Sequence, residues 1–320
     1  MFSKRDVQEF YWEKKVLPKI KITILGTTAG VPTKERAHTA ICVRYESAAR
    51  FTCLFDCGEG TQRQMLIAGI GINSVDRIFV THWHGDHCFG IPGIVDTMGF
   101  DGRTRPLYIH GPEARKMRSR SGPLYPMGKF KMVTRDVPFR GERIFEVFRS
   151  DECRVLSVPA KHSIPAVSYA FIENDRFTID MEKAARHGFS ENDKRFGAVR
   201  EKGSCVIEKK RVTLEEISNK TSGRKVVYSG DTEVCDNLVK IAKGADLLIQ
   251  DCTYVDSPGG GRQHCHASFP EVVKMTETLG VKKVVLTHFS RRYRDFEMIR
   301  RTVEAHSGFE MAEDFYSVTL

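Results

Sequence analysis

The chain is organised around one stretch, residues 79–87, which reads Phe79-Val80-Thr81-His82-Trp83-His84-Gly85-Asp86-His87. It begins in a β-branched and aromatic run that is typical of the end of a strand. Side chains two residues apart on an extended backbone point the same way, so His82 and His84 can bind one cation together. Gly85 permits a sharp turn, after which Asp86 and His87 can face a different point in space. Imidazoles with one carboxylate suit zinc or a similar first-row divalent ion, so the stretch predicts a metal site.

The overall composition is that of a folded protein with an excess of positive charge. The 320 residues are 41% hydrophobic and 28% charged, which supports a sizeable core and argues against disorder. The formal net charge of +9 favours a polyanionic partner, but a basic protein without such a partner has the same balance.

Cysteine usage and the N-terminal residues predict the compartment. The nine cysteines include no repeated Cys-x-x-Cys pair, which argues against a disulfide framework or a zinc finger and favours a reducing interior. No apolar run is long enough to span a membrane. The first residues lack the apolar core of a signal peptide, and their acids argue against a transit peptide. We therefore expect a cytoplasmic protein with no membrane partner.

The hydrophobic pattern predicts mostly strands first and a regular alternation of strands and helices later. In the first part we expect strands at 21–25, 40–45, 51–55, 77–80, 107–110, 144–148, 154–158 and 167–172, and helices at 2–17, 62–68 and 91–99. In the last part we expect strands at 225–228, 246–249 and 283–286, and helices at 232–242, 268–279 and 295–305. From about 176 to 224 the chain is polar and mostly basic, which indicates an insertion or a protruding arm. We expect one α/β domain over 1–320, with two sheets and outer helices.

Three further candidate ligands follow apolar strands. His162 comes just after the strand at 154–158, Asp231 follows Ser229-Gly230 after the strand at 225–228, and His288 follows the strand at 283–286. Open sheets tend to place their sites where strands end, so these side chains are expected at the same rim as the histidine-rich stretch. Together they supply the donors that a two-metal site needs.

The spaced set His82-x-His84-x-Asp86-His87, with the three later residues, resembles the metallo-β-lactamase superfamily. That resemblance implies an αββα sandwich of two mixed sheets with the metals in a cleft at one edge. Shorter strings resemble tRNase Z in its short form, a family of zinc endonucleases that trim tRNA 3′ ends; they lie at 26–36, 54–62, 265–268 and 287–293, with Gly111-Pro112 after a strand. The resemblance implies that one zinc ion is held by His82, His84 and His162, a second by Asp86, His87 and His288, and that Asp231 bridges both.

Two features depart from the family's pattern. Asp251 stands where the family usually has a glutamate, and its side chain is one methylene shorter. The segment at 176–224 occupies the place of the family's tRNA-gripping arm, but Gly188-Phe189-Ser190-Glu191-Asn192-Asp193 replaces the usual Gly-Pro-rich tip.

Phosphodiester hydrolysis also needs groups that move protons and bind substrate. Two metals would activate a shared water and clamp the phosphate oxygens, and the resemblance implies that Asp86 also holds the proton of that water. His266, oriented by Asp251, is a candidate donor to the departing 3′ oxygen, with a solvated loop residue as the alternative. The candidate substrate contacts are Arg292, Tyr293, Lys34 and Arg36. A packed or solvated residue without a substrate role is an equally good interpretation of each. Four histidines match no motif and receive no role: His38, His110, His187 and His306.

Three functions are compatible with these features. The first is a zinc endoribonuclease that removes the 3′ trailer of precursor tRNA, carries two Zn²⁺ per chain (Mn²⁺ or Fe²⁺ fit similar ligands) and forms a homodimer, as the resemblance implies. The second is a small-molecule phosphodiesterase, arylsulfatase or lactonase of the same fold, because the same metal loop serves all of them. The third is a metal-stabilised RNA-binding protein with little catalysis.

Overall fold

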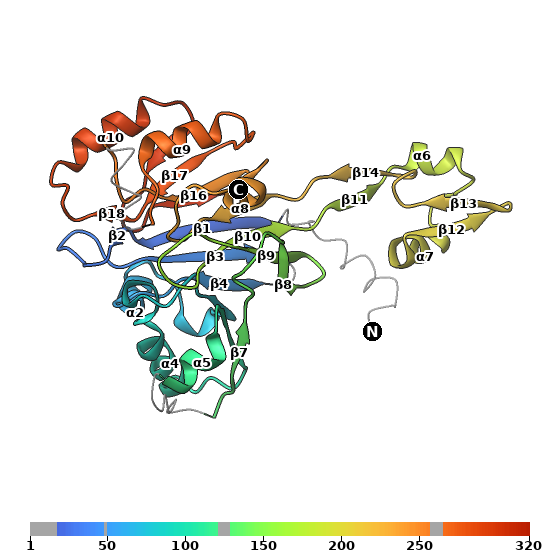
Figure 1. Ribbon diagram of the computed structural model, residues 1–320. Helices are drawn as coiled ribbons and strands as arrows, with labels where there is room; N and C mark the ends of the chain where they lie inside the picture. The colour runs from blue at the N-terminus through green and yellow to red at the C-terminus, as the bar shows by residue number, and fades with distance from the viewer. Residues whose placement is uncertain (1–17, 48–49, 121–128, 257–264) are drawn as a thin grey trace.

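The computed structural model describes residues 18–47, 50–120, 129–256 and 265–320 (Figure 1). The helix expected at 2–17 lies outside these residues. In the described part, two seven-stranded mixed sheets carry helices on their outer faces. The expected αββα sandwich is therefore confirmed.

The first sheet is built from the N-terminal half of the chain and closed by the last strand. Its order is β20 (Ser317–Thr319), β1 (Lys19–Gly26), β3 (Ala40–Glu46), β4 (Phe51–Phe55), β5 (Arg77–Phe79), β6 (Leu107–Gly111) and β7 (Met132–Asp136). Strands β4 to β7 run parallel, so their carboxyl ends share one edge of the sheet. The loop with the histidine-rich stretch leaves β5 at that edge.

The second sheet has the same mixed character. Its order is β19 (Phe309–Met311), β17 (Val284–Thr287), β16 (Leu247–Asp251), β15 (Lys225–Tyr228), β10 (Val167–Glu173), β9 (Cys153–Pro159) and β8 (Phe145–Arg149). Strands β15, β16 and β17 are parallel, whereas β10 and β9 are antiparallel to their neighbours. The candidate ligands after β15 and β17 therefore leave this sheet at one end.

Apolar side chains fill three layers. Buried residues such as Ile22, Phe79, Tyr169 and Phe171 form the core between the sheets, as the alternation of each strand requires. Outside the first sheet lie α2 (Thr61–Ile67), α3 (Gly85–Cys88), α4 (Ile91–Phe100), α5 (Ala114–Arg120) and the short helix η2 (Ile72–Ser74). Outside the second lie α8 (Asp236–Ala242), α9 (Phe269–Thr276) and α10 (Phe296–Glu304).

A short parallel pair, β2 (Thr28–Ala29) with β18 (Phe289–Ser290), joins the two halves beside the candidate ligands.

The basic segment extends from the sandwich as an arm (Figure 1). It leaves through β11 (Arg176–Ile179), returns through the antiparallel β14 (Ser218–Thr221), and carries α6 (Met181–Arg186), α7 (Arg195–Lys202), β12 (Ser204–Ile207) and β13 (Lys210–Thr213) between them. Its tip is not merely polar, because buried residues including Phe189, Val199 and Ile217 form a separate apolar cluster. At the neck, Arg224 Nε lies 2.7 Å from the buried Glu173 carboxylate.

One helix begins later than the sequence pattern predicts. The expected helix at 232–242 begins only at Asp236, because the preceding residues form a loop that turns Asp231 towards the other candidate ligands. No helix in the described part of the chain is long and apolar enough to cross a membrane.

Candidate metal centre

Seven side chains from distant parts of the sequence converge at the carboxyl ends of the strands. The histidine-rich loop follows β5, and the other three residues follow β9, β15 and β17. Their donor atoms form two overlapping groups, His82-His84-His162 and Asp86-His87-Asp231-His288, with the atoms of each group within 4.8 Å of one another. Five of the seven residues line a cleft of about 730 Å³: His84, Asp86, His162, Asp231 and His288.

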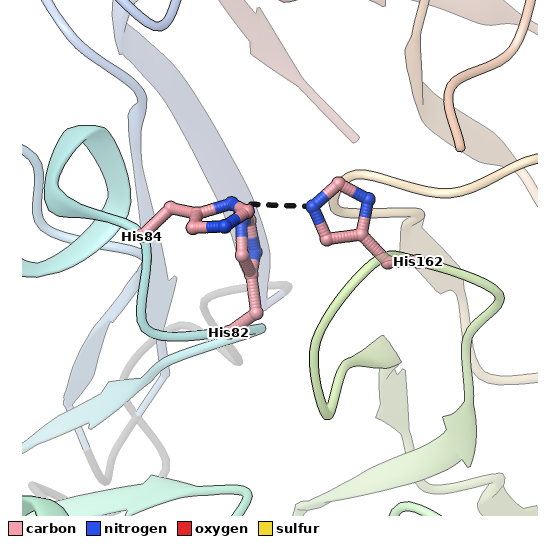
Figure 2. A group of neighbouring side chains, drawn as sticks. All are labelled: His82, His84 and His162. Atoms are coloured by element: carbon pink, nitrogen blue, oxygen red, sulfur yellow. Dashed lines mark hydrogen bonds between the residues drawn. The ribbon is translucent and has the colours of Figure 1, made fainter. Parts of the chain in front are cut away.

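The first group consists of three imidazoles from two loops (Figure 2). His84 Nδ1 lies 2.9 Å from His82 Nε2 and 3.2 Å from His162 Nε2. His82 is fully buried, and its Nδ1 lies 3.1 Å from Thr81 Oγ1. The ring of His162 is held through its Nδ1, 3.1 Å from the carbonyl oxygen of Cys265.

The second group combines two imidazoles and two carboxylates. His87 Nε2 lies 3.2 Å and His288 Nε2 3.3 Å from Asp231 Oδ2. Both nitrogens lie 3.5 Å from Asp86 Oδ2, which also accepts a hydrogen bond from Gly30 N. The Asp231 oxygen is also 3.7 Å from His82 Nε2, so one carboxylate reaches both groups.

The donor set fits divalent cations. Nitrogens bound at 2.0–2.1 Å to a tetrahedral zinc ion lie about 3.4 Å apart, which is close to the spacings seen here. The other carboxylate oxygen, Asp231 Oδ1, is buried and makes no hydrogen bond. A buried carboxylate oxygen without a partner is costly unless a cation neutralises it, so this atom is a further indication that the site binds a cation.

The electrostatics of the two groups favour a bound cation in different ways. Burial lowers the pKa of His82 well below its ordinary value, and that of His84 and His162 as well, so these imidazoles keep their lone pairs free for a metal. Burial opposes the charged form of His288, but nearby carboxylates, led by Asp231, outweigh it and raise its pKa to about 10. The second group is therefore rich in negative charge that a cation would balance.

A further carboxylate orients one of these imidazoles from behind. Asp56, which directly follows β4, lies with Oδ2 2.7 Å from His87 Nδ1. Asp56 also accepts hydrogen bonds from Thr81 N and from the hydroxyl of Tyr228. Such contacts fix the ring orientation and tautomer of a ligand histidine. Asp56 was not among the predicted site residues, although its place at the end of the apolar strand at 51–55 was a usable signal.

Asp56→Asn is expected to lower metal affinity about 10–100-fold, because the amide weakens the orientation and basicity of His87. Competition with a chelating dye measures this loss, and thermal unfolding checks that the variant is folded. Asp101→Asn, at an exposed position after α4, serves as a matched control. Unchanged affinity in a folded Asp56→Asn protein would contradict this role.

The predicted proton donor lies beside the metal-ligand candidates. His266 Nδ1 is 2.8 Å from Asp251 Oδ2, so the shorter carboxylate still reaches the histidine. Burial opposes protonation of His266, but Asp251 outweighs it and raises its pKa. Burial also opposes ionisation of Asp251, yet His266 and His288 lower its pKa to about 2. The raised pKa favours the protonated form of His266, and Nε2 is its other hydrogen-bonding atom.

The candidate substrate contacts are divided between the cleft rim and a neighbouring hollow. Arg292 is exposed at the rim, with its guanidinium 4.4 Å from the ring of Tyr254, which lines the cleft; it also donates to the hydroxyl of Tyr293. Lys34 and Arg36 instead line an adjoining hollow of about 320 Å³.

Of the four candidate substrate contacts, Arg36 is the one that the structure places furthest from such a role, because its side chain is buried. It is only 5% exposed, and its Nη1 donates to Thr27 Oγ1 and to the carbonyl oxygen of Ala312. Its guanidinium packs 4.1 Å from the ring of Phe296. This arginine anchors the first loop. It could contact a substrate only if its guanidinium left these partners.

Comparisons with known proteins agree with this geometry. A family model described as "Anti-Pycsar protein Apyc1" matches residues 20–191, and one described as "Beta-lactamase superfamily domain" matches residues 211–289. Ribonuclease Z of Methanothermobacter thermautotrophicus is 39% identical over 303 residues, which cover 93% of this chain and 96% of the relative. The chain belongs to the ribonuclease Z family.

Other ribonuclease Z proteins match over similar lengths. The one from Archaeoglobus fulgidus is 34% identical over 93% of this chain and 97% of its own. Among solved structures, human tRNase Z, short form, has a TM-score of 0.64 and 25% identity, covering 93% of this chain and 98% of that one. These matches span the sandwich, the cleft and the arm alike, so membership of the ribonuclease Z family rests on nearly the whole chain.

Proposed function

We propose that this protein is a zinc-dependent endoribonuclease that removes the 3′ trailer of precursor tRNA. The observation that carries the proposal is the position of Asp231, whose Oδ2 lies within 3.7 Å of imidazole nitrogens in both ligand groups. One carboxylate at that position suits a pair of metal ions, and paired ions are suited to phosphodiester hydrolysis. The ribonuclease Z relatives support tRNA as the substrate.

In this proposal the seven side chains hold two ions. His82, His84 and His162 would hold one ion, Asp86, His87 and His288 would hold the other, and Asp231 would contribute to both. Zinc is favoured by the histidine-rich set, although manganese and iron use similar ligands. When bound, the metal pair supplies a nucleophile at neutral pH and neutralises charge on the phosphate.

The chain's own groups perform the proton transfers. Asp86 lines the cleft, and hydrogen bonds from neighbouring histidines outweigh burial and hold its pKa far below the usual range. It therefore remains ionised and could hold the proton of the attacking water through a hydrogen bond, which would orient that water. His266 is held through Nδ1 by Asp251 and, when protonated, can donate from Nε2 to the 3′ oxygen as the phosphodiester breaks.

The arm is the proposed grip on the tRNA backbone. We treat it as an insertion in a single domain of residues 1–320; between 176 and 221 it has eleven Lys and Arg against eight Asp and Glu. Lys209, Lys210 and Arg211 are exposed together at the turn into β13. Phosphate contacts from such residues release counterions and make binding strongly dependent on salt.

Replacing Lys209, Lys210 and Arg211 together by Gln is expected to raise the KM for precursor tRNA and to leave kcat nearly unchanged. The slope of log KM against log salt is expected to fall by about 2–3, one for each lost phosphate contact. Hydrolysis of bis-p-nitrophenyl phosphate, which is too small to reach the arm, is the control. An unchanged salt slope would show that these three cations do not meet the RNA.

The proposal includes a cytoplasmic homodimer. The family resemblance favours two copies, and the buried or half-buried free cysteines in the described residues fit a reducing compartment. Light scattering coupled to size exclusion tests the oligomeric state directly.

The deciding experiment combines metal analysis with mapping of the cut. Zinc-loaded protein is expected to carry two ions per chain and to cut a 5′-labelled precursor tRNA once, after the acceptor stem. Turnover of bis-p-nitrophenyl phosphate without RNA cleavage would instead support a small-molecule hydrolase. RNA binding without turnover of either substrate would support a binding protein.

A further inference from the structure

Strands β7 and β8 are edge strands of the two sheets (Figure 1). Residues of both strands line a further hollow. Its volume is about 430 Å³, and its lining shares no residue with the lining of the metal cleft. It is lined by Arg77, Tyr108, His110, Arg135, Asp136, Pro138, Phe145, Glu146 and Val147.

Strand register explains why the polar lining gathers here. Arg77 pairs with Tyr108 between β5 and β6, and His110 pairs with Arg135 between β6 and β7. Because residues two apart on a strand share a face, these four side chains lie on the face that carries Phe79 into the core. Towards β7 this face reaches the open edge of the sandwich, where polar side chains replace apolar ones.

Arg77 is held in a fixed orientation. Its guanidinium carbon lies 4.1 Å from the ring centre of Tyr108 and 4.1 Å from that of Phe148, one ring from each sheet. Its Nη1 lies 3.1 Å from His110 Nε2. No carboxylate in the described part of the chain forms an ion pair with it. Arg77 is therefore half-buried and packed between two rings, without an anionic partner among the described residues.

The other donors of the hollow are also uncommitted. Arg135 is exposed, and the structure gives it no ion-pair partner among the described residues. Burial, reinforced by Arg77 and Arg135, lowers the pKa of His110 to about 3, so its ring is neutral at pH 7. Because Nε2 faces the Arg77 donor, the ring hydrogen belongs on Nδ1, which makes the imidazole a further donor.

The two acids of the lining are engaged by cations outside it. Asp136 accepts a hydrogen bond from Arg115 N and lies 3.7 Å from Arg115 Nε. Glu146 is bound by Arg149, with one nitrogen at 2.7 Å. Two arginines therefore remain in the hollow without compensating negative charge.

We propose that this hollow binds the phosphate group of a nucleotide, separately from the metal cleft. The planar fork of Arg77, pre-oriented by two rings, suits bidentate contact to phosphate, and Arg135 adds a second cation from the neighbouring strand. The volume lies in the range of small-ligand sites, and Phe145 and Val147 offer an apolar wall to a sugar or base. The phosphate can come from a free nucleotide or from an RNA chain.

Calorimetric titration of the zinc-loaded protein with AMP tests the proposal. Arg135→Gln, at an exposed position, and Arg77→Lys, which keeps the charge but loses the fork, are each expected to weaken one class of AMP sites about tenfold. Arg140→Gln, an exposed arginine beside the lining, is the matched control and is expected to bind AMP as the unchanged protein does. Hydrolysis of bis-p-nitrophenyl phosphate is expected to stay the same in all three variants, so a failure here is separable from a failure of the proposed nuclease function.

The KM for precursor tRNA distinguishes the two sources of phosphate. A variant that weakens AMP binding and leaves this KM unchanged indicates a free nucleotide as the ligand. A variant that raises KM several-fold at constant kcat indicates a phosphate of the RNA, with or without AMP binding. If Arg135→Gln, which removes no packed side chain, alters neither AMP binding nor KM, the proposal is wrong.

Discussion

Asp231→Asn is expected to reduce cleavage of precursor tRNA by at least about 10³-fold, because a metal pair contributes several kcal/mol to the transition state. The amide has the shape of the carboxylate but lacks the charge that reaches both ligand groups, from His82 on one side to His87 and His288 on the other. The metal content is expected to fall below two ions per chain.

Elemental analysis and single-turnover cleavage measure these two effects. Asp236→Asn is the matched control, because this exposed aspartate lies in the first turn of α8, five residues further along. A folded Asp231→Asn protein that kept two ions and near-normal cleavage would remove the basis of the proposed bridging role.

His266→Ala is expected to lower kcat for precursor tRNA about 10²–10⁴-fold while both metal ions stay bound, because the alanine removes a proton donor without removing a ligand. In the wild-type protein, His266 must be protonated to act as the donor. Activity should therefore fall as the pH rises through the raised pKa of this group. That limb of the pH–rate profile should disappear in the variant.

Asp251→Asn provides a second readout of the same pair. Without the carboxylate 2.8 Å from Nδ1, the pKa of His266 should fall, and the loss of activity should begin at lower pH. His306→Ala, at an exposed position two residues after the end of α10, is the control. An unaltered pH profile in both Asp251→Asn and His266→Ala would show that another group protonates the leaving oxygen.

The convergence of the seven candidate ligands could be predicted because each follows an apolar strand. Strand exits meet at one edge of a sheet whatever the details of packing, so His162, Asp231 and His288 could be grouped with residues far away in sequence. The two-layer sheet architecture was predictable for a related reason, since alternating apolar positions on each strand require a second layer to cover them.

Side-chain roles that depend on tertiary packing were less predictable from the sequence. Arg36 lies in a loop that looks solvated, yet Thr27, Ala312 and the ring of Phe296 come together around it only in the folded protein. The role of Asp56 likewise depends on His87 approaching from the next strand's loop. The apolar cluster in the arm could not be predicted from the sequence, because its members are scattered singly along a polar and charged segment.

The neck of the arm has a consequence for how the arm is joined to the sandwich. β10 and β15 pair with each other directly, and the Glu173–Arg224 ion pair closes the gap where the arm departs. The arm, with its own apolar cluster, is thus a cassette inserted into a hairpin that is already complete. A change in the length or composition of this cassette would therefore leave the strand pairing at its base, and the edge of the sandwich that carries the candidate ligands, unaltered.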